Sequence, residues 1–142
     1  MVTLRILKLL EQNGFGTISV DTPVTEDGLY FENLPQDCTG VAIFSRGAEM
    51  GRGLRRSQAF DLYSRGENNV DGMRKLEQIT ELMIESFAVC TLPVIEDIDE
   101  TEYASVSIVP VSNIENAGAD ENDRVLYSMT AQVTYSLKSE IV

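Results

Sequence analysis

The chain has 142 residues, of which 43% are hydrophobic and 24% charged, and its 23 acidic and 11 basic side chains give a formal net charge of −12. This charge disfavours a nucleic-acid-binding surface, because affinity for phosphates comes from lysine and arginine. The absence of histidine removes the commonest general base and the commonest zinc ligand. The composition is typical of a globular protein, and we expect one domain over residues 1–142.

Membrane insertion and export are not expected. No run of apolar residues reaches the roughly 18–20 that a spanning helix needs. Residues 1–8 mix charges into their apolar run and lack a cleavage site of small residues, unlike a signal peptide. Cys38 and Cys90 have no neighbour at metal-ligand spacing, so we expect reduced thiols and synthesis in the cytoplasm.

Residues 3–13 are expected to form the first helix. Leucines recur there at three- and four-residue spacing, whereas Arg5, Lys8 and Gln12 fall on the opposite side and are expected to face solvent. Gly14 follows and can take the left-handed conformation that ends many helices.

The longest helix is expected to begin after Asn68, which can cap it, and to end at Phe87. Apolar side chains form one stripe along this segment. They are Val70, Met73, Leu76, Ile79, Met83, Ile84 and Phe87. The helix follows a strand-like segment, 58–64, in which Phe60 and Leu62 share one face.

Alternation of apolar and polar side chains predicts further strands. The clearest case is 125–137, where the odd-numbered residues are apolar or aromatic. The other extended segments are expected at 17–20, 29–31, 41–46, 92–95 and 103–111. Polar surface loops are expected at 21–28, 96–102 and 112–123.

These elements predict an α+β domain with an antiparallel sheet of about four to five strands and two helices packed on one face. Long hairpin loops are expected to be mobile. Residues 47–53 hold three glycines and are interpreted as a flexible hairpin tip. A phosphate-binding loop would open a helix, whereas a strand follows here.

Charge is segregated along the chain. Five carboxylates gather in one short run, namely Glu96, Asp97, Asp99, Glu100 and Glu102. Five arginines gather in another region, namely Arg46, Arg52, Arg55, Arg56 and Arg65. Complementary patches suit a head-to-tail contact between identical subunits. The alternative is that both stretches are merely solvated; the carboxylates also allow a divalent cation, but their spacing misses the EF-hand pattern.

Catalysis has little support in the sequence. Without histidine, an enzyme needs paired carboxylates, an activated lysine or an activated cysteine. Lys8, Lys75 and Lys138 are all expected to face solvent. Asp61, beside Tyr63, is interpreted as a surface charge opposite an arginine. We therefore expect no catalytic, cofactor or metal site, and keep a small carboxylate-based enzyme as a remote alternative.

The segment FDLYSRG at 60–66 precedes MRKLEQITELM at 73–83, and two long strands are expected after it. Together with ILKLLEQNGFGT at 6–17 and VAIFSRG at 41–47, this order resembles the minor capsid and tail-terminator proteins of long-tailed bacteriophages. The resemblance covers essentially the whole chain. It rests on the order of elements and on the strand-Arg-Gly-helix junction, and the acidic run 96–102 has no counterpart in it.

The resemblance implies a structural protein of the virion, assembled in the host cytoplasm, that forms a hexameric ring on the finished tail tube. Such a ring would stop tube polymerisation and join the tail to the head-completion protein, with DNA passing through its lumen without specific binding. A head-completion, or stopper, protein is the alternative. We expect the arginines around residues 47–53 to dock on a neighbouring copy or on the tube. The acidic run would lie at the lumen or meet the arginines between subunits.

Overall fold

The computed structural model describes residues 2–19, 27–52 and 54–138. Its helices are α1 (Val2–Gln12) and α2 (Asn69–Leu82), and α2 continues into a π-helical turn, Met83–Phe87. Its strands are β1 (Thr17–Ile18), β2 (Gly28–Phe31), β3 (Gly40–Arg52), β4 (Arg55–Arg65), β5 (Tyr103–Pro110), β6 (Glu115–Ala119) and β7 (Val125–Leu137). Residues 20–26, which include the end of a predicted strand and most of a predicted loop, and residue 53 of the predicted tip lie outside the described part.

The strands of the described residues form one seven-stranded sheet in the order β1-β2-β3-β4-β7-β5, with β6 also paired to β7. β1 runs parallel to β2, and β2 parallel to β3, whereas the other pairs are antiparallel. The predicted antiparallel sheet of four to five strands is therefore wrong, since the sheet is mixed and larger. The parallel arrangement depends on the connection 32–39, whose Leu34 and Cys38 pack with Tyr30 and Ala42 on one face of the sheet.

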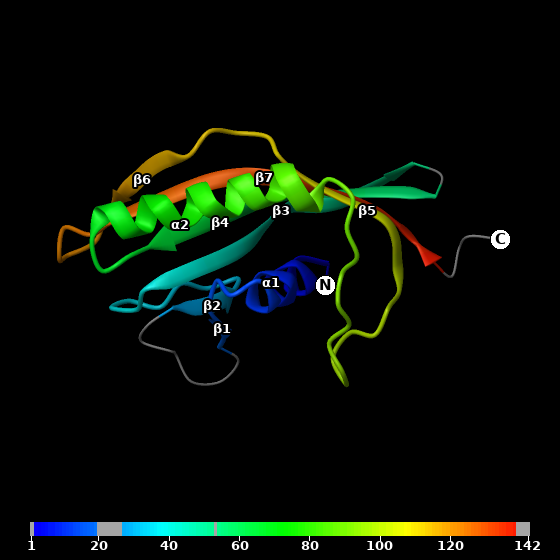
Figure 1. Ribbon diagram of the computed structural model, residues 1–142, viewed down its shortest axis with the longest axis horizontal. Helices are drawn as coiled ribbons and strands as arrows, with labels where there is room; N and C mark the ends of the chain where they lie inside the picture. The colour runs from blue at the N-terminus through cyan, green and yellow to red at the C-terminus, as the bar shows by residue number, and fades with distance from the viewer. Residues whose placement is uncertain (1, 20–26, 53, 139–142) are drawn as a thin grey trace.

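Both helices contribute to the main core on the opposite face of the sheet. Figure 1 shows α2 lying along β4 and β7, with α1 beside β2 and β3. Ile6 and Leu10 of α1, Leu76 and Ile79 of α2, and Leu62 of β4 are fully buried in this core. The predicted inward face of β4 is therefore confirmed.

The start of α2 is as predicted, but its apolar stripe is not. The side chain of Asn68 accepts a hydrogen bond from the N–H of Asp71 at 2.9 Å and caps the helix. Val70 in the first turn and Ile84 in the π-helical turn are exposed, contrary to the expected stripe. The π-helical turn inserts an extra residue and so changes which side chains face the sheet from Met83 onward, whereas Val70 lies before it and its exposure has no such cause.

Residues 47–52 form strand and bulge where the sequence predicts a flexible tip over 47–53, and residue 53 lies outside the described part. β3 continues to Arg52, and its pairing with β4 shifts after Arg46. Gly47 has a φ of +73°, a conformation that glycine adopts readily. The buried amide of Gln58 donates to the carbonyls of Arg46 and Gly47 at 3.3 and 3.1 Å, which satisfies the backbone of the bulge. The glycine therefore builds a bulge in an ordered hairpin.

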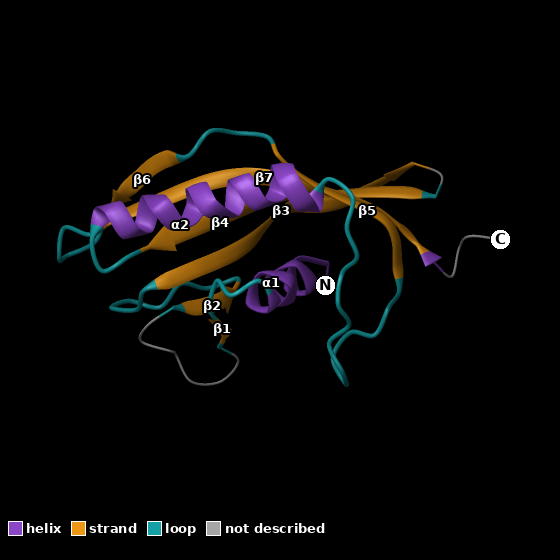
Figure 2. Cartoon of the chain, in the orientation of Figure 1, coloured by secondary structure: helices purple, strands orange, loops and turns teal. Residues whose placement is uncertain are grey.

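The predicted edge strand at 92–95 is absent from the described structure. Residues 88–102 instead form a loop that leaves the end of α2 and descends past α1 before reaching β5 (Figure 2). Ile95 makes a single bridge, to Asp99, four residues later. The carbonyls of Leu92 and Pro93 accept hydrogen bonds from an arginine of α1 and pair with no strand.

The C-terminal half follows the predicted alternation only where one face is buried. β7 is confirmed over Val125–Leu137, and Met129, Ala131, Val133 and Tyr135 point into the core. The predicted loop 112–123 contains β6, in which every residue is exposed. A strand that is exposed on both faces shows no alternation, which explains why the sequence does not reveal it.

Candidate functional site

Arg65 is separated from the other arginines of the predicted basic patch. It ends β4, whereas Arg55 and Arg56 begin this strand. Its side chain is buried and donates to the carbonyls of Pro35 and Cys38 at 3.0 and 3.3 Å. Arg65 therefore fastens the 32–39 connection and is not available to a partner.

Arg46 projects from β3, beside the bulge, onto the face of the sheet opposite the main core. Its guanidinium lies 3.6 Å from the Asp61 carboxylate and donates to the Thr130 hydroxyl at 3.1 Å. The expectation that Asp61 faces an arginine is thus confirmed. The side chain of Arg52 lies outside the described part of the structure.

Arg56 belongs to a network that fixes the bulge of β3 to β7. Its Nη1 lies 3.3 Å from Oε1 of Glu49, and the Tyr135 hydroxyl donates to the other oxygen of Glu49. Burial and the Glu49 carboxylate both raise the pKa of the Tyr135 hydroxyl above its ordinary value. A substitution of Arg56 would therefore disturb internal contacts as well as the surface.

Arg55 is exposed, and its Nη1 donates to the carbonyl of Ser105 at 2.9 Å. No carboxylate of the described residues lies within ion-pair distance of it. Met50 is 73% exposed and Leu54 50% exposed on the same hairpin. Met50, Leu54 and Arg55 are called the hairpin surface below. Beside it lies a hollow of about 450 Å³, lined by Met50, Gly51, Arg55, Arg56, Ser57 and Thr134.

The acidic run is organised by Arg5 of α1, which the sequence places on the solvent side. That placement is wrong, since Arg5 is only 1% exposed. Its guanidinium lies 3.4 Å from the Asp99 carboxylate and 4.8 Å from the centre of the Tyr103 ring. It also donates to four carbonyls, those of Leu92, Pro93, Asp99 and Thr101. The N–H groups of the planar Arg5 guanidinium therefore bind the loop 88–102 to α1.

Asp99 is the buried member of the acidic run and differs from the mobile, solvated carboxylates that the sequence predicts. Burial opposes its ionisation, but hydrogen bonds from Thr101 and the charge of Arg5 outweigh this effect. The pKa of Asp99 therefore lies below its ordinary value. Ionised Asp99 stabilises the fold above the unfolded pKa of about 3.9, and this contribution is lost as the pH falls through the folded pKa.

The stability difference between wild type and Asp99→Asn is expected to shrink as the pH is lowered from about 5 to 2, because protonation removes the same interaction. Urea unfolding at several pH values measures this difference. Asp97→Asn, at an exposed neighbouring position, is the matched control and should follow the wild type. A difference for Asp99→Asn that stays constant over this range would contradict the assignment.

The remaining carboxylates of the run lie at the surface. Glu102 pairs with Lys138 at 3.2 Å, whereas Glu96, Asp97 and Glu100 are exposed and have no cationic partner within the described residues. Val94 and Ile98 are also exposed, by 48% and 55%. The acidic loop surface is defined as Val94, Glu96, Asp97, Ile98 and Glu100. Among the described residues, no three His, Cys, Asp or Glu side chains converge as metal ligands.

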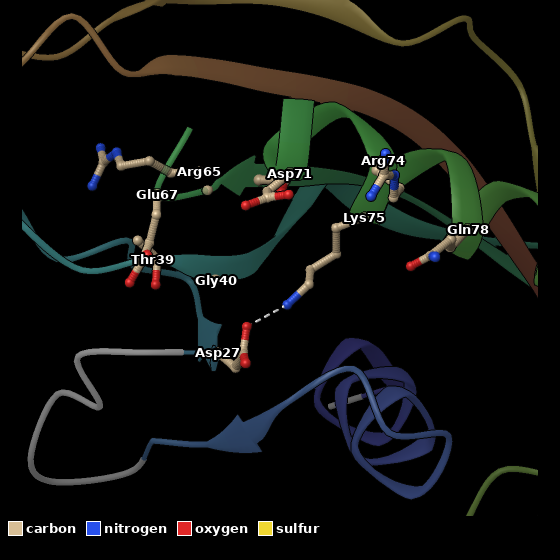
Figure 3. A pocket seen from close by; sticks show the side chains of 11 residues that line it. Asp27, Thr39, Gly40, Arg65, Glu67, Asp71, Arg74, Lys75 and Gln78 are labelled. Atoms are coloured by element: carbon tan, nitrogen blue, oxygen red, sulfur yellow. Dashed lines mark hydrogen bonds and ion pairs between the residues drawn. The ribbon is translucent and has the colours of Figure 1, made fainter. Parts of the chain in front are cut away.

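A groove of about 400 Å³ lies between α2 and the ends of β2 and β3. Lys75 reaches across it and pairs with Asp27 at 2.7 Å (Figure 3). Glu67, Asp71 and Arg74 also line it. Because it mixes both signs of charge and its lysine is already paired, the groove does not favour one class of ligand.

Four exposed apolar residues of these surfaces, Met50, Leu54, Val94 and Ile98, are not among the residues predicted from the sequence. Large apolar side chains inside a glycine-rich or an acidic stretch were the available signal, since exposed apolar side chains that lie together are typical of contact surfaces. No helix of the described residues is long and apolar enough to cross a membrane. The sequence matches no protein-family model and no curated protein.

Proposed function

We propose that this chain is a structural protein of a long-tailed bacteriophage that forms a hexameric ring on the end of the tail tube. The ring stops tube polymerisation and joins the tail to the head-completion protein. The observation that carries the proposal is the end of the β3–β4 hairpin, where Met50, Leu54 and Arg55 are exposed together. The resemblance of four sequence segments to tail-terminator proteins supplies the class of assembly.

Two properties of the described surface support self-association. Exposed apolar side chains beside a charge are typical of surfaces that another protein covers. The hairpin surface and the acidic loop surface are chemically different, and contacts between two different surfaces of identical subunits generate rings when the rotation closes.

The partners follow from this role. They are further copies of the chain, the tail-tube protein and the head-completion protein, and no membrane is involved. With a net charge of −12, the chain repels DNA, which can therefore pass through the lumen without specific binding. The protein is assembled in the host cytoplasm and ends at the head-tail junction of the virion, where it acts without catalysis or a cofactor.

The test is an electron micrograph of the lysate from a phage that carries an early stop codon in this gene. Overlong, headless tails beside DNA-filled heads are expected, because a tube without a cap continues to grow and cannot join a head. Tails of normal length beside leaking or empty heads would favour the stopper protein. Particles of normal appearance would contradict both roles.

A further inference from the structure

We propose that the hairpin surface of one copy binds the acidic loop surface of the next copy, with Ile98 seated in the hollow beside Met50 and Arg55. The inference deepens the proposed function and rests on the self-association that this function requires. It identifies the occupant of the hollow as a second copy of this chain, and it makes the contact heterologous, because each copy contributes a different surface on each side.

The apolar parts of the two surfaces fit one contact. Exposed Met50 lines the hollow and Leu54 is exposed on the same hairpin, whereas Ile98 is exposed on a tight turn and Val94 just before it. This turn is closed by hydrogen bonds from Ile98 and Asp99 to the carbonyl of Ile95, at 3.1 and 2.9 Å. A protruding turn facing a hollow allows the apolar side chains of both copies to leave water together.

The charges of the two surfaces are complementary. Arg55 has no carboxylate partner within the described residues, and Glu96, Asp97 and Glu100 have no cationic partner there. In a chain with a net charge of −12, association of copies is opposed by general repulsion. A contact that places Arg55 beside these carboxylates reduces the repulsion locally and fixes the orientation of the copies.

Both surfaces are held in place before they meet. Arg5 binds the loop through four carbonyls and the Asp99 side chain, so the exposed positions 94 and 96–98 sit on an anchored backbone. Gln58 and the network of Arg56, Glu49 and Tyr135 fix the bulge behind the hairpin. Such preorganisation lowers the conformational entropy that binding costs.

Within one copy no ion pair joins Arg55 to the carboxylates of the acidic loop surface, among the described residues, and Arg55 instead donates to the backbone carbonyl of Ser105. Figure 1 shows the β3–β4 hairpin extending at one end of the sheet, whereas the loop between α2 and β5 descends past α1 in a different direction. When this contact is repeated, each copy is related to the next by the same rotation. The assembly then closes into a ring or continues as a filament.

The test is disulfide cross-linking of the full chain carrying both Leu54→Cys and Ile98→Cys. The native thiols interfere little, because Cys38 is buried and burial raises the pKa of the Cys90 thiol to about 11. The double variant is expected to give a ladder of covalent oligomers under oxidation. Each single variant should give no covalent oligomer, and a mixture of the two should give covalent dimers only. Dimers from Leu54→Cys alone, or no ladder from the double variant, would overturn the proposal.

A charge exchange provides the second measurement, by sedimentation velocity or by counting of rings in micrographs. Arg55→Glu and the pair Glu96→Lys with Glu100→Lys should each weaken assembly at least about tenfold. The combination of all three changes in one chain should restore it. Arg74→Glu and Glu115→Lys, at exposed positions outside both surfaces, are the matched controls. Failure of the combination to restore assembly would overturn the contact.

The outcomes for the contact and for the proposed function are separable. If the stop-codon lysate shows overlong tails but the double cysteine variant gives no cross-linked ladder, the terminator role is supported and this contact is contradicted. Conversely, the double cysteine variant could give a ladder while the stop-codon lysate shows normal tails and heads. That result would support the contact and contradict the terminator role.

Discussion

Replacement of Arg5 by methionine is expected to lower the free energy of unfolding by about 3–5 kcal/mol. Methionine keeps much of the stem volume but removes the guanidinium. The Asp99 carboxylate and the four carbonyls of the loop then lose their donor inside the protein. Breaking a buried pair from one side is costly, because the remaining charge stays desolvated without compensation.

Chemical denaturation at neutral pH measures this loss directly, and in thermal unfolding it corresponds to a decrease in Tm of roughly 10 °C for a domain of this size. Arg74→Met on the exposed side of α2 is the matched control and should change stability by less than about 0.5 kcal/mol. The stability loss of Arg5→Lys should lie between those of the two variants, because lysine keeps the positive charge but lacks the planar set of N–H donors. A loss below about 1 kcal/mol for Arg5→Met would contradict the role given to Arg5.

Substitution of Gly40 by alanine is expected to destabilise the protein by about 3 kcal/mol or more. Gly40 begins β3 with a φ of +141°, in the region that favours glycine. A Cβ at this position would overlap the backbone of Gly28 in the parallel neighbour β2. Relief of this overlap requires the two strands to separate, because backbone atoms cannot rotate away as a side chain can.

Gly14→Ala is the control for the conformational cost of placing alanine at a positive φ, without a steric overlap. Gly14 also has a positive φ, +83°, but no atom lies within 4 Å of the position that its Cβ would take. Its substitution should cost only about 1–2 kcal/mol. Urea unfolding measures the loss in free energy of unfolding for each variant, and the difference between the two losses reports the close packing of β2 against β3. Equal losses would contradict the proposed overlap at Gly40.

The elements that the sequence predicts correctly are those whose periodicity reports burial on one face. α1, β4 and β7 bury alternate or helically spaced side chains, so their patterns can be recognised within one segment. The parallel pairing of β2 depends on where residues 32–39 lead the chain, and β6 is exposed on both faces. Neither feature leaves a local pattern, and the predicted sheet is wrong for that reason.

The candidate surfaces could be predicted only in part, because their arrangement is set by distant contacts. The sequence indicates a basic and an acidic stretch, but it assigns Arg65 and Asp99 to the surface, where the fold buries both. Arg5 is interpreted as solvent-facing because charge on a helix usually is. A loop from the middle of the chain covers that side of α1, and no pattern within α1 reveals it.

The anchoring of α1 also constrains how the chain folds during synthesis. Arg5 binds carbonyls that lie 87–96 residues further along the chain. At about 5–20 residues per second, the ribosome needs roughly 5–20 s to synthesise this interval. Throughout that time the leucine-rich α1 has left the ribosome without the loop that completes its surroundings. Final docking of the first helix therefore cannot precede the emergence of Thr101, and until then α1 lacks the carbonyls that bind its buried arginine.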